Sequence, residues 1–233
     1  MIEKFNSCIC LLNLMSLQSV NNRKTTFITG ERNMKKNFVD ALKNRRSHYA
    51  ISPESPISDK EIQHIVETVL TYVPSAFNSQ TTRMVLLLGE NHLKLWEIVK
   101  ETLKSRVSSK DFTQTEAKIN NSFASGYGTI LFFEEQTIVE NLQAMFPTYK
   151  ENFPGWSVQA SAMHQLTTWV MLEDAGFGAS LQHYNPLIDD EVLKAWDLPK
   201  SWKLIAQMPF GMPTGEIGEK EVDELNKRMK VFK

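Results

Sequence analysis

Cysteine is almost absent from this chain of 233 residues: Cys8 and Cys10 are its only two, and both lie within the first ten residues. A disulfide framework, a thiolate metal site and a catalytic cysteine are therefore excluded for the rest of the chain. The five histidines are scattered without ligand spacing, so we expect no metal site. This cysteine usage predicts a cytoplasmic protein.

The sequence also has no large excess of acidic or basic residues, no long apolar run and no glycine-rich phosphate-binding loop. The net charge is −1, which provides no basic field for nucleic acid. No stretch approaches the roughly 20 uninterrupted apolar residues that span a bilayer. Neither Gly-x-Gly-x-x-Gly nor Gly-Lys-Ser/Thr occurs, which disfavours a classical nucleotide-binding fold. A composition of 42% hydrophobic and 23% charged residues predicts one globular domain with a substantial core.

The first 33 residues differ from the rest of the chain. An apolar run, 8–17, follows Lys4, but Asn13 and Ser16 interrupt it and no Ala-x-Ala-like cleavage site follows, so a signal peptide is disfavoured. Residues 30–33, just before Met34, can be encoded by a purine-rich stretch that resembles a bacterial ribosome-binding site. We therefore expect residues 1–33 to be a non-native or disordered extension and residues 34–233 to form the domain.

Helical and strand patterns alternate along residues 34–233. A serine and a glutamate three residues apart, Ser58 and Glu61, form a capping box that opens a helix ending at Pro74. Further helices are expected at 35–44, 93–103, 156–175 and from a cap at Asp189 to 196, and strands at 83–89, 128–134, 178–181 and 202–208. Residues 209–213 are expected to turn, and 136–154 carry few periodic signals. The pattern predicts an α+β fold, a small sheet flanked by helices.

The helix expected at 156–175 carries apolar residues on nearly every side, and Gly176 is placed to cap its C-terminus. Such a helix is predicted to be buried all round. In a domain of this size, a helix that apolar often lies at the centre of a dimer.

Two polar segments hold the strongest functional signal. Asn44–Tyr49 contains Arg45, Arg46 and Ser47, and guanidinium groups present fixed donors that match phosphate oxygens. Pro74–Gln80 is rich in donors and acceptors and can hold the edge of a polar heterocycle. Together the segments indicate a phosphorylated cofactor, although each alone also fits a solvated helix end or ordinary turn chemistry.

Four segments in order resemble the FMN-dependent nitroreductase family, in a branch of small bacterial and fungal proteins. They are Arg45–Ser47, the Pro-Ser-x-x-Asn-Ser-Gln stretch at 74–80, the stretch 176–189, and a C-terminal tail whose matching parts, 207–211 and 227–233, count as one segment. The resemblance covers about residues 34–233. It implies a nitroreductase-like fold, with a mixed or antiparallel sheet, and an intertwined homodimer that holds two FMN molecules at its interface.

The resemblance also implies an activity. NADH or NADPH would reduce FMN, and a nitroaromatic or quinone-type acceptor would then reoxidise it in the same pocket, by ping-pong hydride transfer through flavin N5. The protein would supply no nucleophile and no catalytic residue of its own. The rival readings are a flavin-binding sensor or regulatory protein with little turnover, and a cofactor-free interaction protein.

The resemblance assigns the candidate cofactor-binding residues. Arg45 and Arg46 correspond to contacts with the FMN phosphate and ribityl chain, Asn78 and Gln80 to contacts from the partner subunit, and residues 182–184 to the segment beside the isoalloxazine ring. The full set is Arg45, Arg46, Ser47, Ser75, Asn78, Gln80, Asn120, Gln182, His183, Tyr184 and Gly211.

One position departs from the family pattern, and one region resists interpretation. Many relatives carry Lys or Arg just after the Phe-Gly turn, where this chain has Met212. We therefore expect phosphate neutralisation to fall on Arg45 and Arg46, or on Arg83 or Lys220. The aromatic residues between 146 and 156 are expected to form a lid or wall of the pocket.

Overall fold

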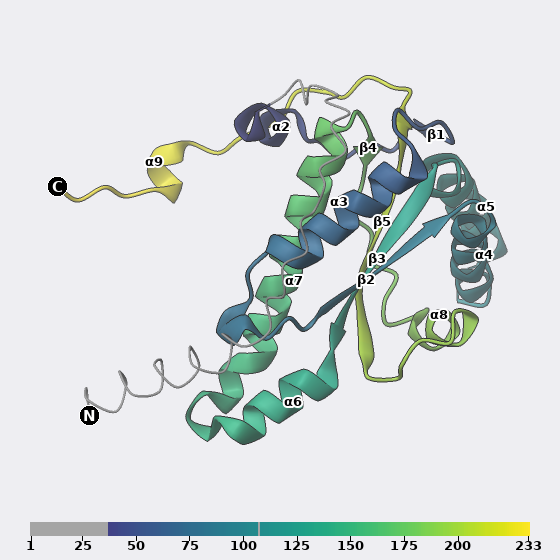
Figure 1. Cartoon of the computed structure of the whole chain (residues 1–233). Coiled ribbons are helices and arrows are strands. Elements are labelled where there is room, and N and C mark those ends of the chain that lie inside the picture. Colours follow the sequence, from purple (N-terminus) through teal and green to yellow (C-terminus); the bar gives the residue numbers. More distant parts are fainter. Residues whose placement is uncertain (1–36, 107) are drawn as a thin grey trace. The chain divides into compact units, whose positions relative to one another are not determined.

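A computed structural model describes residues 37–106 and 108–233 (Figure 1). The prediction for residues 1–33 lies outside the described residues. The helices are α2 (Phe38–Asn44), α3 (Asp59–Tyr72), α4 (Glu90–Lys104), α5 (Ser109–Ile119), α6 (Gln136–Met145), α7 (Phe153–Asp174), α8 (Asp189–Ala195) and α9 (Leu225–Arg228). Three short helical segments are η1 (Ala76–Asn78), η2 (Asn120–Ala124) and η3 (Pro147–Asn152). The strands are β1 (Ile51–Ser52), β2 (Thr82–Leu88), β3 (Gly128–Glu135), β4 (Gly178–Ala179) and β5 (Trp202–Pro213).

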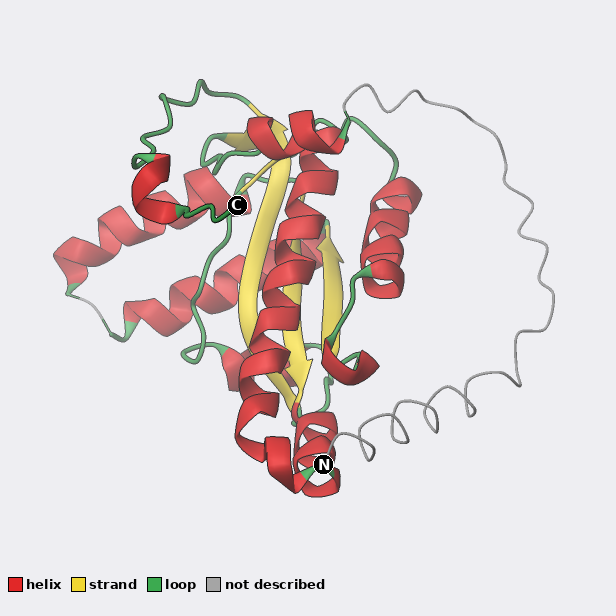
Figure 2. Cartoon of the chain, turned by 90° about the vertical axis from the view of Figure 1, so that its left-hand side faces the viewer, coloured by secondary structure: helices red, strands yellow, loops and turns green. Residues whose placement is uncertain are grey.

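The strands form one antiparallel sheet in the order β1-β5-β3-β2, with β4 also paired to β5. The central strand β3 alternates its side chains between two cores. Ile130 and Phe132 pack on the side of α3 and α7, whereas Leu131 and Phe133 pack on the side of α4 and α8. Figure 2 shows the long helix α7 lying along the sheet. This α+β architecture confirms the expected fold class.

Local signals at two helix ends behave as the sequence predicts. The Ser58 side chain accepts the Glu61 N–H, and the Glu61 carboxylate accepts the Ser58 N–H at 2.8 Å, so the capping box is confirmed. Gly176 has a φ of 96° and follows the end of α7, and the Phe177 N–H returns to the Leu172 carbonyl at 2.9 Å. Gly176 therefore terminates α7 in the left-handed conformation that glycine adopts without strain.

Two local predictions were wrong. Residues 209–213 continue β5 instead of turning, because β1 and β4 pair with them and provide partners that the local sequence does not reveal. Asp189 is the first residue of α8 and its cap is Ile188, so the aspartate acts in the first turn, where a carboxylate also favours a helix. The region 136–154, for which the sequence predicted no element, is mostly helical, as α6 and η3.

Within the single chain, α7 is not buried on all sides, and its burial at the centre of a dimer stays a prediction. One face of this helix exposes apolar side chains, with Val158 52% exposed, Met163 40% and Leu166 46%. The opposite face buries polar side chains against the sheet, among them Ser161, His164 and Thr168. Apolar side chains such as Ala160 and Leu172 are buried as well, so α7 lacks the division of an ordinary surface helix into an inward apolar face and an outward polar one.

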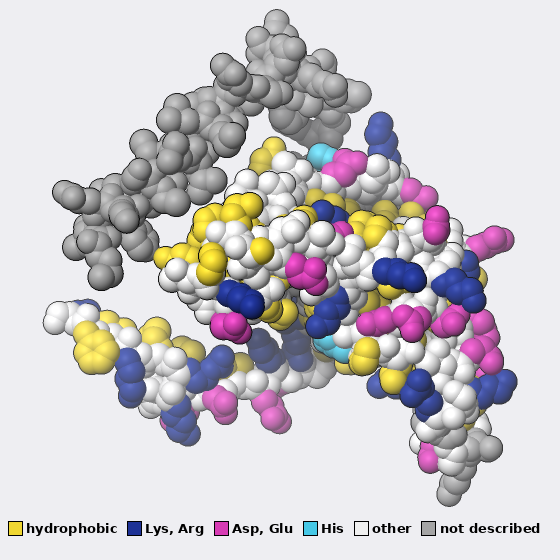
Figure 3. Space-filling view, turned by 90° about the horizontal axis from the view of Figure 1, so that it is seen from below, with side chains coloured by type: hydrophobic (Ala, Val, Ile, Leu, Met, Phe, Trp, Pro, Cys, Tyr) yellow, Lys and Arg dark blue, Asp and Glu magenta, His cyan; other side chains and the backbone are white. Residues whose placement is uncertain are grey.

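Viewed from below, acidic and basic side chains are interspersed over the visible face, with small apolar groups between them (Figure 3). This face of the described chain shows no extended patch of one sign. Within the described residues, no helix is both long and apolar enough to cross a membrane.

Candidate functional site

The Arg45–Ser47 segment leaves α2 and joins the edge of the sheet. Ser47 forms a bridge with Ala179 of β4, and the His48 N–H donates to the Ala179 carbonyl at 2.9 Å. The approach is close, because a Cβ on Gly178 would lie 2.8 Å from the His48 Cβ. Backbone pairing and this glycine therefore fix the Arg-Arg-Ser segment beside β4 and β5.

The two arginines of this segment are half-buried, and Arg45 lies against α7. The Arg45 guanidinium carbon is 4.3 Å from the centre of the Trp169 ring. Burial lowers the pKa of Arg45, the neighbouring charge of Arg46 lowers it further, and Glu173 acts in the opposite direction. Arginine remains protonated despite such shifts. Within the described part of the chain, neither arginine forms an ion pair within 4.0 Å.

The segment 182–184 lies farther along the same edge. Gln182 and Gln207 of β5 exchange two backbone hydrogen bonds, at 2.7 and 2.9 Å, and the Tyr184 N–H donates to the Gln207 Oε1 at 2.8 Å. The His183 N–H, between these two, has no hydrogen-bond partner in residues 37–106 and 108–233, and His183 is exposed. Among the described residues, this edge thus presents the His183 N–H as an unpaired donor between the hydrogen-bonded N–H groups of Gln182 and Tyr184.

Tyr184 and Gly211 are less accessible to a bound cofactor than the resemblance implies. The Tyr184 ring packs at 6.0 Å from the Trp96 ring, and burial raises the pKa of its hydroxyl. Gly211 is buried between β1 and β4, where a side chain would collide with the Ser52 carbonyl. Tyr184 and Gly211 therefore contribute to this edge of the sheet through their backbone atoms.

The Ser75–Gln80 turn carries a concentration of unusual backbone geometry. Phe77, Asn78 and Gln80 have φ values of 58°, 50° and 48°, and they make up three of the four non-glycine residues with positive φ in the described chain. Such conformations cost free energy and cluster at functional sites. The Ser75 Oγ accepts the Gln80 N–H at 2.9 Å, and Arg83 donates to the Gln80 carbonyl at 2.7 Å. Asn78 and Gln80 are exposed at the surface of the turn.

An aromatic cluster, comprising Phe77, Phe146, Tyr149, Phe153 and Trp156, anchors this turn. Phe77 contacts the other four rings, and its ring stacks on Trp156 with centroids 5.8 Å apart. The rings at 146–156 expected to form a lid or wall thus pack on the turn that carries Asn78 and Gln80. The signal that sequence reasoning missed is Phe77 itself, whose ring holds the turn to α7.

The structure separates the predicted site residues into two groups. Arg45 lies against Trp169 and Phe77 against Trp156, and both tryptophans belong to α7. These positions are 13 residues apart, which corresponds to about 20 Å along a helix. Asn120 is exposed on η2, and the Phe123 ring of η2 lies 6.3 Å from the Tyr184 ring of the 182–184 segment. One chain therefore does not bring the arginines and the Asn78–Gln80 turn together.

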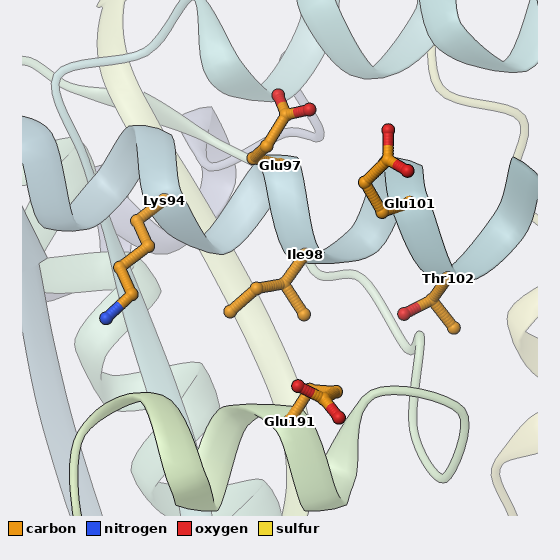
Figure 4. Close-up of a pocket in the computed structure, with 6 residues that line it drawn as sticks. All are labelled: Lys94, Glu97, Ile98, Glu101, Thr102 and Glu191. Carbon is orange, nitrogen blue, oxygen red and sulfur yellow. The ribbon is translucent and has the colours of Figure 1, made fainter.

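Two cavities lie outside these groups. One, of about 390 Å³, lies between α4 and α8 and is lined by Lys94, Glu97, Ile98, Glu101, Thr102 and Glu191 (Figure 4). The other, of about 540 Å³, adjoins His92 and Tyr127. Neither cavity is lined by a predicted site residue.

The alternative phosphate partners lie elsewhere in the structure. Arg83 donates to the Gln80 and Thr82 carbonyls, and so belongs to the turn rather than to the arginine segment. Lys220 is exposed in the segment after β5. Met212 donates its N–H to the Glu54 carbonyl and provides no charge.

The comparisons with known proteins agree with this architecture. The sequence model of the nitroreductase family matches residues 42–212. HBN1 of Saccharomyces cerevisiae is 36% identical over 185 residues, which cover 78% of this chain and 91% of the yeast protein.

Two solved structures are similar to this chain. The nitroreductase CinD from Lactococcus lactis is 41% identical with a TM-score of 0.78, covers 84% of this chain and 100% of its own, and was solved with nicotinic acid. Other structures of CinD hold chloramphenicol and 4-nitrophenol. A structure from Exiguobacterium sibiricum, solved with FMN, is 13% identical with a TM-score of 0.61, covers 84% of this chain and 97% of its own, and shares the fold. The family match and the extent of these similarities confirm the resemblance, and the chain belongs to the nitroreductase family.

Proposed function

We propose that this protein is an FMN-dependent NAD(P)H oxidoreductase that reduces nitroaromatic or quinone-type acceptors by ping-pong hydride transfer. The observation that carries the proposal is the placement of Arg45 and Arg46, two half-buried guanidinium groups at a sheet edge, in a chain of this family. The relative from Exiguobacterium sibiricum that holds FMN supports the choice of cofactor.

The donors of the arginine edge fit a flavin phosphate. Arg45 and Arg46 supply charged donors for the phosphate, and the exposed Ser47 supplies a hydroxyl beside them. Farther along the edge, the free His183 N–H is the donor that suits the ring system. When bound, FMN would accept hydride from the nicotinamide at N5 and pass electrons to the acceptor. The chain's own part is to bind and orient the cofactor and to stabilise negative charge near it.

We propose that a second copy of the chain completes the site. Trp156 and Trp169 lie about equally far from Ala162 and Met163, near the middle of the exposed apolar face of α7. An antiparallel α7 from a second copy, crossing at this midpoint, would bring its Ser75–Gln80 turn towards Arg45 of the first. Apolar burial on the exposed face would drive such a homodimer.

The substrate class follows from a relative. CinD binds 4-nitrophenol and chloramphenicol in its solved structures, which supports nitroaromatic acceptors for this chain. Its nicotinic acid complex supports recognition of a nicotinamide-like ring. We place the protein in the cytoplasm, because its few cysteines fit a reducing compartment.

Steady-state kinetics with NADH and NADPH against nitroaromatic and quinone acceptors test this function. We expect FMN-dependent turnover, with parallel lines in double-reciprocal plots at several fixed acceptor concentrations. A protein that binds FMN but is reduced by neither nicotinamide at a catalytic rate under anaerobic conditions is instead a flavin-binding sensor. A protein that takes up no FMN contradicts both functions and favours a cofactor-free interaction protein.

A further inference from the structure

Trp169 makes a contact that the proposed function does not use. It is half-buried in the last third of α7, and its ring faces the Arg45 guanidinium at 4.3 Å. Trp169 and Glu173 are four residues apart and share one side of the helix. The Arg45 side chain therefore lies against an aromatic face and in the field of a carboxylate.

The geometry of this contact matters for anion binding. A guanidinium group stacks through its flat face, while its five N–H donors point outward in the plane of the group. A contact with the Trp169 ring therefore holds Arg45 without occupying its donors. A salt bridge at the same place would occupy them, but no ion pair of Arg45 occurs among the residues that the structure describes.

We infer that Trp169 is a positioning residue for phosphate recognition: its ring holds the Arg45 guanidinium in place so that the free donors face the FMN phosphate. The inference rests on the proposed function, because it requires that Arg45 bind that phosphate. An Arg45 side chain that already contacts Trp169 has less rotamer freedom to lose when the anion binds. Binding therefore costs less conformational entropy. Trp169 itself need not touch the cofactor.

A comparison of FMN with riboflavin tests this inference, because riboflavin lacks the phosphate. Equilibrium titration of the apoprotein would give both dissociation constants. For Trp169→Leu we expect the FMN dissociation constant to rise about fivefold to thirtyfold, as the loss of one cation–π contact predicts. The riboflavin constant should stay within about twofold, since the contact acts only on the phosphate. Trp169→Phe retains an aromatic face and should lose less FMN affinity than Trp169→Leu.

Two further variants sharpen the test. In Arg45→Ala the phosphate partner is already missing, so adding Trp169→Leu should cost no further FMN affinity. Trp196→Leu is the matched control, because it removes a similar contact, with the Lys94 ammonium at 5.1 Å, on the opposite side of the sheet. The control should leave both constants unchanged. The oligomeric state of each variant should be measured alongside.

Several outcomes overturn the inference. Equal losses of affinity for FMN and riboflavin in Trp169→Leu would make Trp169 a structural residue. An unchanged FMN dissociation constant in this variant would show that the contact between Trp169 and Arg45 does not contribute to FMN binding. If Trp169→Leu fails to fold, Arg45→Lys decides the question, because lysine keeps the charge but loses the planar face. Unchanged FMN affinity in Arg45→Lys then contradicts the inference, and selective loss for FMN supports it. Failure of the wild-type protein to bind either flavin contradicts the proposed function instead.

Discussion

At the scale of single residues, Glu134 connects three elements through one buried carboxylate. It is 1% exposed on β3, where its Oε1 accepts the Thr82 hydroxyl at 2.6 Å and its Oε2 accepts the Ser157 hydroxyl at 2.5 Å. Thr82 follows the Asn78–Gln80 turn, and Ser157 lies near the start of α7. The carboxylate thus fixes α7 against the sheet close to the strained turn.

Replacing Glu134 by alanine should lower the free energy of unfolding by about 3 kcal/mol, because two buried hydrogen bonds are lost and the Ser157 hydroxyl loses its acceptor, while Thr82 keeps a longer contact with the His164 Nδ1 at 3.4 Å. Glu134→Gln should cost less, since the amide can still bond both hydroxyls. Urea denaturation at a fixed protein concentration provides the measurement. A Glu134→Ala variant as stable as the wild type would show that the carboxylate gains nothing from these bonds.

His92 should make stability depend on pH. Its Nε2 faces the Ala124 carbonyl at 3.2 Å and its Nδ1 faces the Thr129 hydroxyl at 2.9 Å. The Trp96 N–H donates to the same Thr129 hydroxyl oxygen, so the hydroxyl proton is free to be donated to the His92 Nδ1. Nδ1 therefore acts as the acceptor, and the neutral imidazole carries its proton on Nε2. Burial lowers the pKa of His92 below its ordinary value, against a smaller opposing effect of the Ala124 carbonyl.

The sign of this effect follows from proton binding. The unfolded state takes up a proton near pH 6.5, whereas the folded state resists it to lower pH, so stability is lost as the pH falls below about 6.5. Unfolding free energies measured between pH 7.5 and 5.5, roughly the titration range of histidine, should fall in the wild type and fall less in His92→Gln. His48, whose pKa is also lowered by burial, adds to the slope in both proteins. Equal slopes would contradict the assignment.

At the scale of elements, local signals and long-range pairing account for different parts of the structure. The capping box at Ser58 and the cap at Gly176 depend on neighbouring residues, and the sequence predicts both. The continuation of β5 through residues 209–213 depends on β1 and β4, which are distant in sequence. The exposed face of α7 could not be predicted either, because its composition does not reveal which apolar residues face the sheet.

The exposed face of α7 should control assembly. We expect the wild type to be a dimer and Met163→Asp to dissociate it, with self-association weakened roughly a hundredfold or more, because a buried unpaired charge costs several kcal/mol. The variant should also lose FMN, since each proposed site needs both chains. Leu93→Lys, at an exposed leucine on α4, is the matched control and should remain a dimer. Sedimentation measures the outcome, and a dimeric Met163→Asp would place the interface elsewhere.

At the scale of the whole molecule, the sequence identifies the family and the fold but only half of the site's arrangement. The arginine segment and residues 182–184 lie along one edge, as the resemblance implies. Asn120 is exposed on η2, whose Phe123 ring contacts the Tyr184 ring. The Asn78–Gln80 turn, by contrast, lies about 20 Å away along α7. This separation could not be derived from spacing, because it depends on the length and packing of α7. The assignments of all these residues stay predictions.

This chain is proposed to bind FMN through the arginine edge. The most direct measurement is an absorbance titration of the purified apoprotein with FMN, for the wild type and for the variant with Arg45 and Arg46 both replaced by alanine. We expect the wild type to bind one FMN per chain and the double variant to bind none at the same concentrations. A wild type that takes up no FMN would contradict the proposed function, and a double variant that retains FMN would show that the phosphate lies elsewhere.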